Sequence, residues 1–233
     1  MPTIEADSAA TAVIDAPAPV RSSTRRRHTG GGALLRMGSH PIGGMLYLKQ
    51  QEGLARLGRP IRPVAVTAET GDISSLATNT GAKPWIVTGW QDVETWGAAI
   101  ITFDDGSRAV VNASDAVVGG MESRLDVFMS NAHFKIHMSP NNLVQAYAPD
   151  AAVFADEYLQ EKQETKAGWT TPMPDEDWTS GHLAMCQDFV DAVATDRAPR
   201  SDGRLGLEVI RVIYAGYLSA ATGQRVELPA LTA

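Results

Sequence analysis

One short segment of the 233-residue chain brings together residue types that could do acid–base chemistry. His40 directly precedes Pro41, and Arg36 lies one helical turn earlier in the sequence. Proline is favoured in the first turn of a helix, so the sequence predicts a helix from Pro41 with Ser39 as its N-cap. His40 would then lie at the positive end of a helix and close to a guanidinium. Both features favour a neutral imidazole that can accept a proton.

Glycines surround this segment on both sides. Residues 30–32 are all glycine, and Gly43 and Gly44 follow the histidine. Because Gly43 and Gly44 have no side-chain bulk, a ligand or another helix could approach the backbone closely just past His40. The alternative interpretation is structural: His40 caps a helix, and the glycines only allow tight packing.

The segment resembles the start of the C-terminal domain of the Gfo/Idh/MocA oxidoreductases. In that family a Gly-Gly run and a leucine precede the motif Asp-x-Gly-x-His and an apolar helix, and here the matching residues read GGALLRMGSH. The resemblance implies that His40 is the catalytic histidine, and it places Arg36 where the family has an aspartate. Similar features follow in a hairpin around residues 103–106 and in the terminal segment 188–229, so that the resemblance covers residues 29–229.

Members of this family are two-domain, NAD(P)-dependent enzymes that act mostly on sugars, inositols and related compounds. The resemblance implies an α+β fold, with a large, mostly antiparallel, open-faced sheet and helices on one face, like a dihydrodipicolinate-reductase-like domain. It also implies a polyol or sugar-like substrate and a homo-oligomer formed through the sheet face, with strands around residues 125–138 at or near the interface. Residues 29–233 would be this substrate-binding and oligomerisation domain. Residues 1–28 are rich in Ala, Pro, Ser and Thr and are expected to form a disordered tail or linker.

The sequence lacks a dinucleotide-binding fingerprint. Such a fingerprint needs a strand, a Gly-x-Gly-x-x-Gly turn and a helix, and the glycines at residues 30–32 and 119–120 lack that context. The family's catalytic lysine lies in a Glu-Lys-Pro motif, whereas Lys83 follows Ala82. NAD or NADP is therefore expected for the family but not for this chain alone. The chain would be a truncated form, or would depend on a separate Rossmann-domain chain.

Arginine at position 36 reverses the charge that the family has there. A guanidinium cannot act as a base, but its paired N–H donors can bind a carboxylate or a phosphate. The first hypothesis is a ligand with an anionic group near Arg36, with Ser39 and a neutral His40 beside it. The alternative is that Arg36 points to solvent and the site is inactive. For the whole chain, a stand-alone non-redox lyase or isomerase, or a ligand-binding module on the same fold, is the second interpretation.

Composition argues against several classes of function. The net charge of −7 gives no support for binding to nucleic acid or to an anionic membrane. No apolar run approaches the roughly 18 residues that a membrane span needs. The single cysteine, Cys186, excludes an internal disulfide and fits a cytoplasmic location. His133 and His137 lie in a predicted strand, where residues four apart are about 13 Å from each other, so no metal site is expected.

Hydrophobic periodicity predicts the elements that must position His40. The two long helices near the ends of the chain carry apolar stripes, and the strands between them are joined by turn-forming residues. Residues 71–92 are rich in turn formers and are expected to form a long excursion. The predicted helices are residues 41–57, 153–163, a segment around 186–193 and 210–221, and the predicted strands are residues 64–70, 96–103, 108–115, 125–129, 134–138, 143–147 and 225–228.

Overall fold

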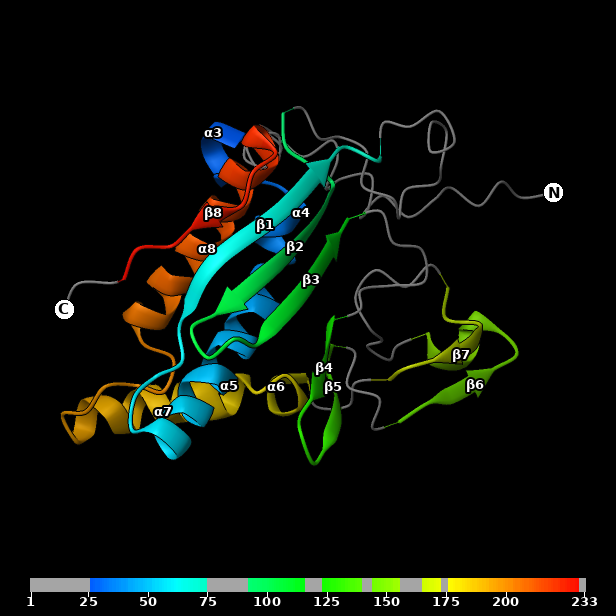
Figure 1. The fold of residues 1–233 in the computed structure, drawn as a ribbon. Coiled ribbons are helices and arrows are strands. Elements are labelled where there is room, and N and C mark those ends of the chain that lie inside the picture. Colours follow the sequence, from blue (N-terminus) through cyan, green and yellow to red (C-terminus); the bar gives the residue numbers. More distant parts are fainter. Residues whose placement is uncertain are drawn as a thin grey trace. The chain divides into compact units, whose positions relative to one another are not determined.

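The computed structural model divides into two compact units, which are described separately (Figure 1). Unit 1 combines Met1–Ala116 with Leu207–Ala233, and unit 2 is Val117–Gly206. No described helix is long and apolar enough to cross a membrane. The residues described by the structure are 26–74, 92–115, 123–139, 144–155, 165–172 and 176–230.

A four-stranded antiparallel sheet forms the centre of unit 1. Its order is β3-β2-β1-β8, with β1 (Pro63–Gly71), β2 (Trp96–Phe103), β3 (Arg108–Ser114) and β8 (Val226–Glu227). Between β2 and β3, Gly106 has a φ of +87°, a left-handed conformation that glycine adopts without steric cost. The predicted hairpin turn at this position is confirmed.

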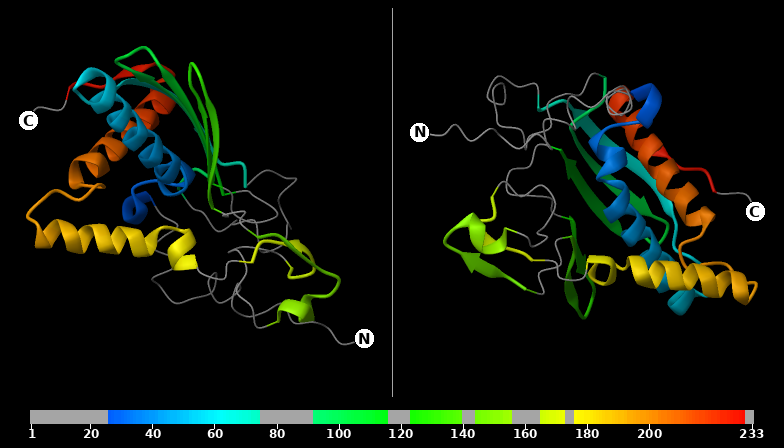
Figure 2. Two further views of the ribbon diagram at one scale, coloured as in Figure 1. Left: turned by 90° about the horizontal axis from the view of Figure 1, so that it is seen from below. Right: turned by 180° about the vertical axis from the view of Figure 1, so that it is seen from behind.

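Helices cover one face of this sheet (Figure 2). The short helices α3 (Arg26–Thr29) and α4 (Ala33–Arg36) lead into α5 (Ser39–Leu57), and α8 (Gly203–Thr222) lies beside α5. α8 packs closely at Gly216: a Cβ there would lie 3.3 Å from Cδ2 of Leu34 and 3.5 Å from the Ala68 Cβ of β1. The fully buried side chains between helices and sheet include Leu34, Ile42, Leu46, Ile61, Val66, Ile101, Phe103, Val212 and Ile213.

On the opposite face of the sheet, apolar side chains reach solvent. Thr67, Ile100 and Val110 pair across β1, β2 and β3 in one row. Ile100 is 48% exposed and Val110 is 77% exposed. Within the described part of unit 1 the helices lie on the other side, so the sheet is open-faced, as the sequence predicted.

The described part of unit 2 contains a short hairpin, a second antiparallel strand pair and several helical segments. In the hairpin, the amide of Met129 donates to the carbonyl of Ala132 at 2.8 Å and closes the turn. In the second pair, the rings of Tyr147 and Trp169 meet edge to face across the strands. The elements are β4 (Ser123–Phe128), β5 (His133–Ser139), β6 (Ala146–Ala148), η1 (Ala151–Phe154), β7 (Gly168–Thr170), α6 (Glu176–Thr179) and α7 (His182–Ala194).

Two details differ from the sequence prediction. The described strands form one four-stranded sheet and two separate pairs, not a single large sheet. The helix expected over residues 153–163 begins as the 3-10 turn η1, capped by Asp150, whose carboxylate accepts from the amide of Ala152 at 2.8 Å. Four parts of the sequence prediction lie outside the described residues: the rest of this expected helix, most of the excursion at residues 71–92, Lys83 and residues 1–25.

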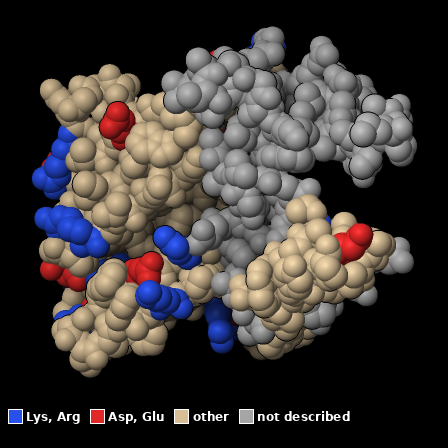
Figure 3. Space-filling view, turned by 90° about the vertical axis from the view of Figure 1, so that its right-hand side faces the viewer, with Lys and Arg blue, Asp and Glu red and all other residues tan. Residues whose placement is uncertain are grey.

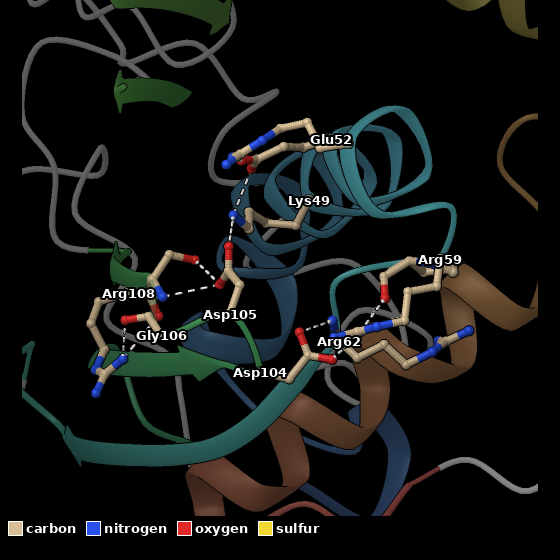
Figure 4. Close-up of polar contacts among 11 residues, drawn as sticks. Lys49, Glu52, Arg59, Arg62, Asp104, Asp105, Gly106 and Arg108 are labelled. Carbon is tan, nitrogen blue, oxygen red and sulfur yellow. Dashed lines mark hydrogen bonds and ion pairs between the residues drawn. The ribbon is translucent and has the colours of Figure 1, made fainter. Parts of the chain in front are cut away.

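Ion pairs fix the turn between β2 and β3 to α5 and to the loop that follows it (Figure 4). The Lys49 ammonium lies 2.6 Å from the Glu52 carboxylate and 2.9 Å from the Asp105 carboxylate. Arg59 pairs with Asp104 at 2.6 Å. These contacts hold the helix that carries His40 against the edge of the sheet.

The change Asp105→Asn is expected to lower the free energy of unfolding at neutral pH by about 1 kcal/mol, because the ion pair is partly exposed. Burial raises the pKa of Asp105, but hydrogen bonds from Ser107 and Lys49 outweigh it and lower the pKa to about 2. Because this pKa is below the ordinary 3.8, the stabilisation is full above that value and is lost as the pH falls toward 2. Urea unfolding at about pH 7 and about pH 2.5 measures this effect, and an equal difference at both pH values would contradict it.

Candidate functional site

The candidate site lies at the corner between α4 and α5. The predicted helix exists but begins earlier than expected, at Ser39, and its N-cap is Gly38. Gly38 has helical φ and ψ of −68° and −26°, so the chain turns into α5 before it reaches Pro41. The prediction of Ser39 as N-cap was therefore wrong: its hydroxyl donates to the carbonyl of Arg36 at 3.2 Å instead.

His40 is exposed in the first turn of α5. The helix is anchored by Ile42 and Leu46, which are 0% and 1% exposed. The same helix thus buries one face against the sheet and presents His40 to solvent at its N-terminal end. An imidazole in this position can exchange a proton with a bound ligand.

Arg36 forms an ion pair with Asp115, directly after the end of β3. The Asp115 side chain is 4% exposed and the Arg36 side chain is 32% exposed. The backbone amide of Asp115 donates to the carbonyl of Thr95 at 2.9 Å, which fixes the carboxylate at the end of the sheet. The alternative hypothesis proposed that Arg36 points to solvent. The structure instead pairs its guanidinium with Asp115.

A second carboxylate, Glu94, holds the start of α4. It accepts hydrogen bonds from the amides of Gly32 at 2.9 Å and Leu34 at 3.0 Å, and from the Tyr217 hydroxyl at 2.7 Å. Burial raises the pKa of Tyr217, and the hydrogen bond to Glu94 raises it further. This arrangement joins the incoming chain to α8; we call Gly32, Glu94 and Tyr217 the Glu94 clasp.

Glycines are required where the incoming chain crosses the clasp. A Cβ on Gly31 would lie 2.0 Å from the Tyr217 hydroxyl, and one on Gly32 would lie 1.9 Å from the carbonyl of Glu94. The Arg26 guanidinium stacks over the Tyr217 ring at 5.0 Å. Gly31 and Gly32 thus serve close packing of the backbone.

Two acidic groups face Arg36 and change the electrostatics expected from sequence. Burial lowers the pKa of Arg36, while the charges of Asp115 and Glu94 oppose this shift. The formal charge of these three groups together is −1, from one guanidinium and two carboxylates. The guanidinium therefore does not create a cationic pocket by itself.

The sequence predicted His40, Arg36 and Ser39 as neighbours, and the structure brings them to one corner. The sequence analysis did not predict the roles of Asp115, Glu94 or Tyr217. One signal for a partner carboxylate was available in the sequence: Arg36 stands where the family has an aspartate, and a part-buried guanidinium needs a negative charge nearby. No group of three or more His, Cys, Asp or Glu side chains that could hold a metal ion occurs among the described residues.

Comparison with known families decides the identity of the fold. The chain matches the family described as "Oxidoreductase family, C-terminal alpha/beta domain" (GFO_IDH_MocA_C) over residues 14–228. The chain belongs to the Gfo/Idh/MocA family. The match begins within the segment that the sequence assigned to the tail and continues to the end of β8. Among curated proteins, none matches the chain.

Solved structures of this family share the fold. GenD2 from gentamicin A biosynthesis, in complex with NAD, is 25% identical with a TM-score of 0.66, and the match covers 90% of this chain and 52% of GenD2. Aldose-aldose oxidoreductase from Caulobacter crescentus, complexed with glycerol, is 21% identical with a TM-score of 0.56, covering 88% and 50% of the two chains. A myo-inositol dehydrogenase from Corynebacterium glutamicum is 15% identical with a TM-score of 0.55, covering 93% and 54%.

The chain spans about half the length of each of these Gfo/Idh/MocA structures. The family assignment and the α+β fold predicted from sequence are confirmed. On the face seen in Figure 3, basic and acidic side chains lie next to one another.

Proposed function

We propose that this chain is the substrate-binding and oligomerising part of an NAD(P)-dependent oxidoreductase that acts on a sugar, an inositol or a related hydroxy compound. The observation that carries the proposal is the exposed His40 in the first turn of α5, in a chain that matches the family over residues 14–228. GenD2, at 25% identity, is described in complex with NAD, and the aldose-aldose oxidoreductase with glycerol.

In this function His40 takes up the proton of a substrate hydroxyl as the alcohol is oxidised, and returns it in the reverse direction. The hydride acceptor would be a nicotinamide held by a partner domain, because this chain lacks the fingerprint that binds one. Arg36 and Ser39 contact the substrate: part of the Arg36 side chain reaches solvent, and the Ser39 hydroxyl, which donates to the chain, can still accept a hydrogen bond.

A hybrid enzyme tests the proposal. The NAD-binding half of GenD2 is joined to residues 14–233, and oxidation of a panel of sugars and inositols is followed by NADH absorbance. We expect NAD-dependent oxidation of at least one member of the panel. A folded hybrid that binds NAD but oxidises no polyol would contradict the proposal.

The isolated chain is expected not to bind NAD or NADP appreciably, because its sequence lacks the strand, glycine-rich turn and helix that hold the pyrophosphate. Isothermal titration calorimetry of the full chain with each nucleotide measures this. The hybrid enzyme is the positive control. A dissociation constant in the low micromolar range for the chain alone would contradict the expectation.

We also propose that the chain self-associates through the open face of its sheet. The exposed side chains of Ile100 and Val110 lie in one row there, and an apolar surface of this kind is typical of an interface. The strands of β4 and β5, with the exposed Phe128 and Phe134, are the second candidate surface.

The double change Ile100→Glu and Val110→Glu is expected to convert the oligomer into a monomer, because it places four like charges in a two-fold interface. Light scattering at tens of micromolar compares it with a control in which the exposed Leu54 of α5 becomes glutamate. A wild-type chain that is strictly monomeric would refute self-association. An oligomer that survives the double change would refute the assignment to this face.

A further inference from the structure

We infer that Asp115 determines ligand specificity at the candidate site: it binds Arg36 internally, and so favours neutral polyols over acidic sugars. This inference rests on the proposed function, since it concerns the ligand of the same site. It also revises the hypothesis from sequence that an anionic group lies near Arg36, because the structure supplies that anion from the end of β3.

The geometry makes Asp115 a positioning residue rather than a ligand contact. Its side chain is 4% exposed, so a ligand cannot reach the carboxylate, whereas the Arg36 side chain is 32% exposed. An external carboxylate at Arg36 would have to compete with a carboxylate that is already in place and buried. An internal partner on a rigid strand end loses little conformational entropy, whereas an external one must be immobilised on binding.

The surrounding charges act in the same direction. Glu94 also faces Arg36, and its carboxylate is held by the amides of Gly32 and Leu34 and by the Tyr217 hydroxyl. With Asp115 present, an anionic ligand approaches a group of formal charge −1. A neutral hydroxyl oxygen accepts hydrogen bonds from the guanidinium without adding a like charge. Removing the Asp115 charge changes the formal sum from −1 to 0 and releases the guanidinium toward ligand.

The experiment compares glucose with glucuronate, which differ at one carbon by an alcohol and a carboxylate. Both are titrated into the full chain by NMR, with wild type, Asp115→Asn, Asp115→Glu and the double variant Arg36→Gln with Asp115→Asn. The matched control is Asp104→Asn, which breaks another Asp–Arg pair of unit 1, with Arg59. Circular dichroism verifies folding, and Asp115→Ser replaces Asp115→Asn if the latter does not fold.

Wild type is expected to bind glucuronate no better than glucose. Asp115→Asn is expected to raise the ratio of glucuronate to glucose affinity at least about tenfold, whereas Asp115→Glu, Asp104→Asn and the double variant are expected to keep the wild-type ratio. An unchanged ratio in Asp115→Asn, or a gain that persists without Arg36, would overturn the inference. If Asp115 had only a structural role, its replacement would lower the affinity for both sugars equally and leave the ratio of the two affinities unchanged.

The two proposals fail in different ways. If the hybrid enzyme binds NAD but oxidises no polyol, while Asp115→Asn still gains glucuronate binding through Arg36, the proposed function is wrong and the role of Asp115 stands. If the hybrid is active and the ratio of affinities does not change, the specificity inference alone is wrong.

Discussion

Replacing Glu94 with alanine is expected to lower the free energy of unfolding by about 3 kcal/mol, the value for losing charge-assisted hydrogen bonds at a part-buried site. The carboxylate accepts from two backbone amides and from the Tyr217 hydroxyl. Its removal leaves the Leu34 amide and the Tyr217 hydroxyl without this acceptor, and only the 3.2 Å bond from the Gly32 amide to the Tyr217 hydroxyl still joins the clasp to α8. Chemical unfolding followed by circular dichroism measures the change.

Glu69→Ala is the matched control, because Glu69 is an exposed glutamate on β1 of the same sheet. A loss in Glu94→Ala no larger than in this control would contradict the role of the clasp. Glu94→Gln keeps the shape of the side chain and loses its charge. Its loss in free energy of unfolding is expected to lie between those of Glu94→Ala and Glu69→Ala.

Alkaline pH provides an independent readout of the same clasp. The pKa of Tyr217 is raised above the ordinary value of 10.0, so the clasp stabilises the protein fully below that value and loses this contribution as the pH rises above it. In Glu94→Ala the Tyr217 pKa should shift back toward 10.0. Tyrosinate absorbance during an alkaline titration, with Tyr217→Phe to assign the signal, measures this shift.

In the hybrid enzyme, His40→Gln is expected to lower kcat by about 10²- to 10⁴-fold with a smaller effect on KM, the usual result of losing a general acid–base group. Glutamine retains hydrogen bonding but cannot exchange a proton at neutral pH. Because the His40 side chain is exposed, the variant should fold normally. Steady-state kinetics measure both parameters.

His28→Gln is the control for this change, since His28 is an exposed histidine on α3. A hybrid that keeps full activity with His40→Gln would exclude His40 as the proton-transfer residue. Equal losses in both variants would indicate a general effect of losing a histidine rather than catalysis.

The fold was largely predictable because its elements carry regular local signals. The turn formers at residues 104–106 between two strand segments predicted the central hairpin, and Gly58 and Gly223, both at positive φ, end the two long helices. The start of α5 was not predictable from Pro41. The backbone at Gly38 is already helical there, and no residue type signals that a short helix passes directly into a long one.

Only part of the candidate site could be predicted from the sequence. His40 and Arg36 are local neighbours, so their proximity follows from the chain itself. Asp115 and Glu94 lie at the open end of the hairpin formed by β2 and β3, and they come close to Arg36, which is 79 residues before Asp115, only because the helices pack on the sheet. Tyr217 has the spacing of a core residue on α8, and the sequence assigned it to the apolar stripe; its hydroxyl acquires a role only where the incoming chain meets the helix.

Unit 1 is built from two separate stretches of chain, with unit 2 inserted between them. During synthesis on the ribosome, the sheet would lack β8 and the clasp would lack Tyr217 until α8 and β8 emerge. Closing this loop of 90 residues, from Val117 to Gly206, costs about 2 kcal/mol more in chain entropy than closing one of about ten residues. Completion of unit 1 therefore has to wait until unit 2 has been synthesised, and until then the apolar face of α5 lacks its neighbour α8.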